Sequence, residues 1–63
     1  MMKIYKVQQE KLSFDWGRFE GYVEIGYYTT KERAEQVKEE TLAETKGDIC
    51  RGEVKIIEIE VND

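Results

Sequence analysis

Few side chains in this chain could do chemistry, because its 63 residues include no histidine and a single cysteine. Acid–base work near neutral pH would therefore fall to carboxylates, to the thiol of Cys50 or to tyrosines. Glu32, Glu35 and Glu39 recur at helical spacing and would share one stripe of a helix. Such carboxylates could bind a metal ion or transfer protons, but basic residues alternate with them, so we interpret the stripe as a solvated helix face.

Cys50 precedes Arg51, and a neighbouring cation favours the reactive thiolate of a cysteine. Because there is no histidine to act as a base, we interpret Cys50 as a half-buried and inert cysteine. Gly17, Gly21 and Gly26 do not have the GxGxxG spacing of a phosphate-binding loop. We therefore predict a protein that is not an enzyme, with no catalytic residue, no metal site and no cofactor.

Aromatic residues are concentrated in residues 13–28, which hold six of the seven aromatic side chains. Within this stretch, residues 10–21 separate two predicted strands by more than the usual hairpin loop of about two to five residues. An extended hairpin would explain this length, with a turn at residues 15–17 and positive φ at Gly17. We call residues 13–19 the aromatic arm.

The aromatic arm is the strongest candidate for a binding surface. In the extended hairpin Phe14 and Phe19 would be cross-strand neighbours, and Trp16 would lie at the tip. Tryptophan and arginine are the residue types most enriched at binding hot spots, and Trp16 is close to Arg18. We therefore predict partner binding by Phe14, Trp16, Arg18 and Phe19. In the alternative, the arm folds back and its rings close one end of the core.

Two other binding functions remain open. The arm could stack on a nucleotide-type small ligand, with Arg18 and Lys11 contacting a phosphate. The acidic helix could instead mimic nucleic acid and occupy a basic groove on another protein. Trp16 fluorescence should respond to nucleotides in the first case, and binding should weaken steeply with salt in the second.

Length and charge narrow the class of protein further. Residues 1–63 are enough for a single domain that is marginally stable, and one cysteine cannot form an intrachain disulfide. No apolar run approaches the roughly 20 residues that cross a bilayer, so we expect a soluble, cytoplasmic protein that does not bind membranes. The net charge is −4, with five basic and ten acidic residues among residues 32–63. Direct binding to nucleic acid is therefore not expected.

Three predicted strands and one predicted helix position the side chains discussed above. The sequence predicts strands near residues 2–9, 21–28 and 53–61, and a helix near 30–46. Thr29 would cap this helix, with Glu32 completing a capping box, and Gly47 would adopt a left-handed conformation after it. The order predicts an α+β protein with ββαβ connectivity. Its three-stranded antiparallel sheet would have the order 2-1-3, with the helix on one face.

The predicted sheet carries apolar residues on both faces, although one helix can cover only one. The helix contributes a thin stripe of Ala34, Val37, Thr41 and Thr45. We expect Ile57, Ile59 and Val61 on the core face. The residues expected on the open face, as the interface of a homodimer, are Ile4, Tyr22, Tyr28, Val54 and Ile56. In the alternative, the aromatic arm covers this face and makes a self-sufficient monomer.

Residues 25–34, together with residues 3–5, resemble a pattern found in small, mostly uncharacterised ββαβ proteins of phages and bacteria. The pattern joins an opening strand of the Lys-Val-Tyr type to a strand that ends in glycine, an apolar and an aromatic residue. Ser/Thr, Lys, Glu, a basic residue and Ala follow. The resemblance implies the same fold and a phage or other mobile-element source. It therefore suggests a protein that binds and modulates a host factor.

Overall fold

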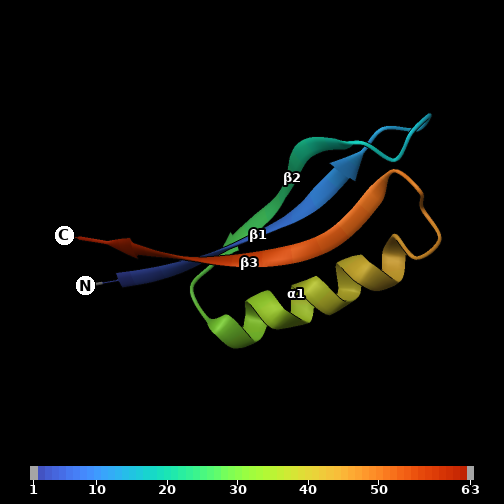
Figure 1. The fold of residues 1–63 in the computed structure, drawn as a ribbon. Helices are drawn as coiled ribbons and strands as arrows, with labels where there is room; N and C mark the ends of the chain where they lie inside the picture. The colour runs from blue at the N-terminus through green and yellow to red at the C-terminus, as the bar shows by residue number, and fades with distance from the viewer. Residues whose placement is uncertain (1, 63) are drawn as a thin grey trace.

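The computed structural model describes residues 2–62 and contains the four expected elements. Strand β1 covers Met2–Leu12, β2 covers Phe19–Tyr28, helix α1 covers Lys31–Glu44 and β3 covers Arg51–Val61. The strands form one antiparallel sheet in the order β2-β1-β3, and α1 lies against one of its faces (Figure 1). The predicted fold class and strand order are therefore confirmed.

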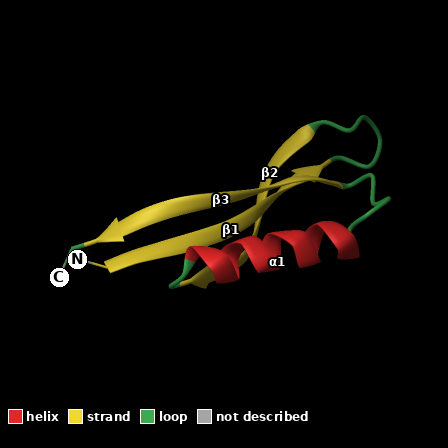
Figure 2. Ribbon diagram, turned by 90° about the horizontal axis from the view of Figure 1, so that it is seen from below, coloured by secondary structure: helices red, strands yellow, loops and turns green. Residues whose placement is uncertain are grey.

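The sheet is not equally wide along its length. Pairing between β1 and β3 begins at Met2 and Val61, whereas pairing between β1 and β2 begins only at Tyr5 and Tyr28. The first residues of β1 and the last residues of β3 consequently form a two-stranded ribbon that extends past β2 and α1 (Figure 2). The aromatic arm is at the opposite end of the molecule.

The hydrophobic core lies between α1 and one face of the sheet, which we call the covered face. Its buried apolar residues are Val7, Ala34, Val37 and Val54, and Tyr5, Ile25, Tyr28 and Ile56 pack against them. The stripe predicted on the helix is confirmed at Ala34, Val37 and Thr41, the buried residues of α1, whereas Thr45 is the half-buried C-cap beyond its end. So small a core leaves much of the apolar surface of the sheet uncovered.

The predicted faces of β3 are wrong. Val54 is 4% exposed in the core and Ile56 packs against it, so neither lies on the open face as expected. Ile57, Ile59 and Val61 were expected on the core face, but they pair with Lys6, Ile4 and Met2 and lie on the open face instead. The register decides the face, because Val54 pairs with Gln9 and Ile56 with Val7, the β1 residues that are buried under α1. Since 14 residues of α1 span about 21 Å and 11 residues of β3 about 37 Å, the helix covers the end of β3 that contains Val54.

Tyr28 is also on the covered face, contrary to expectation, because β2 contains a bulge. Val7 pairs with Gly26 and Gln8 with Glu24, which leaves Ile25 as an extra residue in β2. An extra residue exchanges the faces of all side chains beyond it. Tyr22 stays on the open face, whereas Tyr28 lies against the core and beneath Arg33 of α1, whose guanidinium carbon is 5.9 Å from the ring centroid.

The ends of α1 differ slightly from the prediction. The N-cap is Thr30 rather than Thr29, and its hydroxyl accepts a hydrogen bond of 3.2 Å from the amide of Arg33. The residue three positions after the cap is therefore Arg33, and Glu32 completes no capping box. Beyond the C-cap at Thr45, Gly47 has φ of 86°, the left-handed conformation that was expected.

Candidate partner-binding site

The loop of the aromatic arm is held in one conformation by hydrogen bonds at its base. The amide of Ser13 donates to the carbonyl of Arg18 at 2.8 Å, and the hydroxyl of Ser13 accepts from the amide of Arg18 at 3.0 Å. The amide of Gly17 donates to the carbonyl of Ser13 at 3.0 Å, with φ of 63° at Gly17. The predicted turn and its positive-φ glycine are confirmed, so the arm is a continuation of the β1–β2 hairpin.

The rings at the tip of the arm do not enter the core. Trp16 is 82% exposed and Phe14 is 75% exposed, so the arm does not fold back to close the core with these two residues. Phe14 and Phe19 are not cross-strand partners as expected, because Phe19 pairs with Leu12 and Phe14 lies in the loop. Trp16 is at the tip as predicted.

Phe19 is held by a neighbour that the sequence did not place beside the arm. Its ring makes an edge-to-face contact with Tyr22, with the centroids 5.1 Å apart, and Phe19 remains 50% exposed. Tyr22 is fixed in turn by Lys55, whose Nζ donates to the phenol oxygen at 3.1 Å and lies 5.5 Å from the ring centroid. Because Lys55 is 33 residues away, only the strand order reveals this support.

The charged groups of the arm are at the surface. Arg18 is exposed and its backbone is fixed by Ser13, while Lys11, one of the residues proposed to contact a phosphate, is also exposed at the end of β1. The arm thus presents three exposed rings, those of Phe14, Trp16 and Phe19, and a guanidinium group beside a hydrogen-bonded turn. A protein surface can bury such groups at low entropic cost, because the backbone is already ordered.

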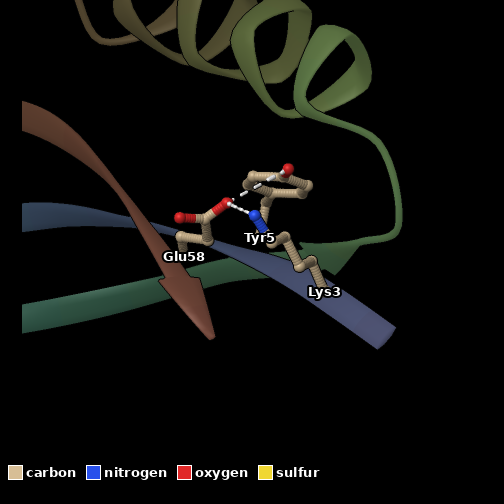
Figure 3. Close-up of polar contacts among 3 residues, drawn as sticks. All are labelled: Lys3, Tyr5 and Glu58. Carbon is tan, nitrogen blue, oxygen red and sulfur yellow. Dashed lines mark hydrogen bonds and ion pairs between the residues drawn. The ribbon is translucent and has the colours of Figure 1, made fainter. Parts of the chain in front are cut away.

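A concave surface is found elsewhere. A shallow depression of about 230 Å³ is lined by Tyr5, Lys31, Ile56 and Glu58, beside the start of α1. Beside it, Glu58 Oε1 accepts a hydrogen bond of 3.4 Å from the hydroxyl of Tyr5 and forms an ion pair of 3.3 Å with Lys3 Nζ (Figure 3). The contact with Glu58 raises the pKa of Lys3. No residue of the aromatic arm lines this depression.

The other side chains considered for chemistry, the carboxylates of α1 and the thiol of Cys50, lie on different elements. Glu32, Glu35 and Glu39 are exposed on α1. Among residues 2–62, no group of three or more acidic or cysteine side chains is arranged to hold a metal ion. Cys50 is half-buried, as interpreted from the sequence, and its amide donates to the carboxylate of Asp48 at 2.9 Å in the loop before β3.

No family model matches this chain, and neither a curated protein nor a solved structure matches it. Within residues 2–62, the helix is too short and too polar to cross a membrane. The function must therefore be inferred from the surface itself.

Proposed function

We propose that the protein is a non-enzymatic binding module whose aromatic arm contacts a protein partner. The observation that supports this proposal most directly is the exposure of Trp16, 82%, at the tip of a turn that is fixed by three hydrogen bonds. Transfer of such a large apolar ring from water into an interface with a partner is favourable. Arg18, two residues further along the chain, supplies a charge that favours one orientation of such a contact.

A protein partner is favoured over a nucleotide because the rings of the arm are widely exposed. Ligand sites for small molecules are concave and bury most of the ligand, whereas Phe14 is 75% and Trp16 82% exposed. The resemblance of residues 25–34 to phage and bacterial ββαβ proteins makes a host factor the partner that we propose. A homodimer is compatible with this role, because the apolar part of the open face lies at the end of the sheet opposite the arm.

The test is quantitative capture from a bacterial lysate, followed by direct titration of each captured protein after purification. Wild-type protein should retain a partner that Trp16→Ala loses, and Trp16→Ala should fold normally because the ring contributes little to the core. Ile49→Ala is the matched control, since Ile49 is 62% exposed but lies in the loop before β3. A partner bound equally well by wild type and Trp16→Ala would contradict the proposed site.

Two further measurements separate the alternatives. A change in Trp16 fluorescence with a panel of nucleotides, in the absence of other proteins, would replace the protein partner with a small ligand. Glu35→Ala and Glu39→Ala should leave binding unchanged, because both carboxylates are on the exposed side of α1 and not on the arm. If either variant lost the partner while remaining folded, and wild-type binding weakened steeply with salt, the acidic mimic would be the better function.

A further inference from the structure

The open face of the sheet has a polar half and an apolar half. Near the arm, Tyr22 and Lys55 meet across β1, and Lys6 Nζ forms an ion pair of 3.3 Å with Glu24. Toward the chain ends the face is apolar. There the strand pairing places Met2 beside Val61, Ile4 beside Ile59, and Lys6 between Ile57 and Tyr27. We call this apolar half the terminal patch, and its residues are Met2, Ile4, Tyr27, Ile57, Ile59 and Val61.

The terminal patch is accessible in the single chain. Tyr27 is 54% exposed, Met2 49% and Ile57 40%, while the other three residues are half-buried. Among residues 2–62 no element covers this face, because α1 lies on the other side of the sheet (Figure 2). The arm does not cover it either, since its tip is at the far end of the molecule. A contiguous apolar patch of this kind usually marks an interface.

The dimensions of the chain also indicate that a single copy is less compact than an ordinary domain of this length. The radius of gyration is 13.0 Å, compared with about 10.6 Å for a compact domain of this length. The accessible surface is 4805 Å², compared with roughly 4,250 Å² for a compact monomer of this mass. The molecule measures 44 × 20 × 11 Å, so it is a thin slab. Stacking a second copy on the broad face would give a thicker particle, whose accessible surface and radius of gyration would be closer to those of a compact protein of its mass.

From these features we propose that two copies of the chain pack their open faces together along their length, in a two-fold dimer that buries the terminal patch. A two-fold axis places each surface against itself, so the surface must be self-complementary in charge. The open face carries charges of both signs close together, because Lys6 forms an ion pair with Glu24 and Lys55 is near Glu10 and Glu53, although the whole chain has a net charge of −4.

The available area is sufficient for a stable pair. A standard interface buries about 800 Å² per partner, and the broad face of the slab, 44 × 20 Å, has about that outline. Two such sheets would stack about 10 Å apart with their side chains interdigitated. The dimer would have a core on both sides of each sheet. It would also carry two aromatic arms, so partner binding would be bivalent.

Dimer formation is tested by the mass of the full chain in solution, measured by light scattering and sedimentation from micromolar to millimolar concentration. Wild type should have the mass of two chains, and its melting temperature should rise with concentration. Ile57→Lys should remain folded by circular dichroism and raise the dissociation constant by about 30-fold or more, the effect expected at the centre of an interface. A single-chain mass throughout the range would overturn the proposal.

Control variants locate the interface. Ile49→Lys introduces the same charge at an exposed isoleucine outside the open face and should keep the mass of two chains. Trp16→Ala should do the same, and a monomeric Trp16→Ala would mean that the arms form the contact, which would overturn the terminal patch. A folded Ile57→Lys with the dissociation constant of wild type would also overturn it. If Ile57→Lys fails to fold, Ile57→Thr keeps a β-branched side chain and should weaken the dimer several-fold.

Discussion

Gln8 and Gln9 are neighbours in β1, and both are almost inaccessible, with exposures of 7% and 1%, yet they lie on opposite faces of the sheet. Gln9 is under α1, where its Nε2 donates to Thr45 Oγ1 at 2.8 Å and to the carbonyl of Gly52 at 3.1 Å. Gln8 faces the open side between Lys55 and Glu24, the strand partners on either side of it. One glutamine is buried by an element of the fold and the other by flexible side chains.

The difference shows how the two faces are stabilised. The covered face is closed by packing and by specific hydrogen bonds, and among the described residues Gln9 Oε1 is a buried oxygen with no partner. The open face is covered only where Tyr22, Lys55 and Glu24 reach across it. Toward the chain ends it is bare apolar surface. We therefore expect substitutions on the covered face to change folding, and those on the open face to change association.

The largest effect is expected from Val37→Asp. Val37 is 6% exposed against the sheet, and an unpaired carboxylate there should cost about 4 kcal/mol or more. A domain of this length has only about 3–9 kcal/mol in total, so the variant should be unfolded by circular dichroism. Gln36→Asp places the same charge on the adjacent exposed position and should cost less than about 1 kcal/mol. A folded Val37→Asp would show that α1 is not essential to the core.

The two glutamines provide a direct comparison of the faces. Gln9→Ala removes the hydrogen bonds to Thr45 and to the carbonyl of Gly52 and opens a cavity, which should cost about 2–3 kcal/mol in urea unfolding. Gln8→Ala should cost less than about 1 kcal/mol, because the side chains around it can close over the gap. Equal losses for the two variants would mean that the open face is as rigid as the covered one.

A smaller effect is expected at Gly26. A Cβ on this residue would lie 2.6 Å from the hydroxyl oxygen of Tyr28 and 2.9 Å from its ring, which folds across the glycine. Gly26→Ala should therefore cost about 1–2 kcal/mol by displacing Tyr28 from the core. The same substitution in a Tyr28→Val background should cost clearly less, because no ring remains to be displaced. An unchanged cost in that background would attribute the loss to the backbone instead.

The smallest effect concerns two surface lysines, one on each face. Hydrogen bonding to Glu58 raises the pKa of Lys3, and hydrogen bonding to Tyr22 raises the pKa of Lys55, both from 10.5. Their contributions to stability are fully present below pH 10.5 and are lost as the pH rises through the raised values. Lys3→Gln and Lys55→Gln should each lose slightly less stability than wild type over that interval in thermal melts. Identical alkaline profiles for all three proteins would contradict this account.

Local sequence patterns were sufficient to predict the strands, the helix and the turn at the tip of the arm. The small-residue stripe of Ala34 and Val37 determined which side of α1 is buried, since helical spacing needs no knowledge of the partner surface. Gly17 determined the turn, because a positive φ favours glycine wherever the turn occurs. The exposure of Trp16 followed from that turn, because a ring at a hairpin tip has no core within reach.

The faces of the sheet were decided only by tertiary structure. Val54 and Ile57 are both apolar residues of one strand, and alternation alone does not say which of them meets the helix. The choice depends on the register between β1 and β3, which places Val54 beside the buried Gln9, and on the extra residue Ile25, which exchanges the faces of β2 beyond it. Both are properties of pairing between distant segments, because register and coverage arise only when the strands and the helix pack together.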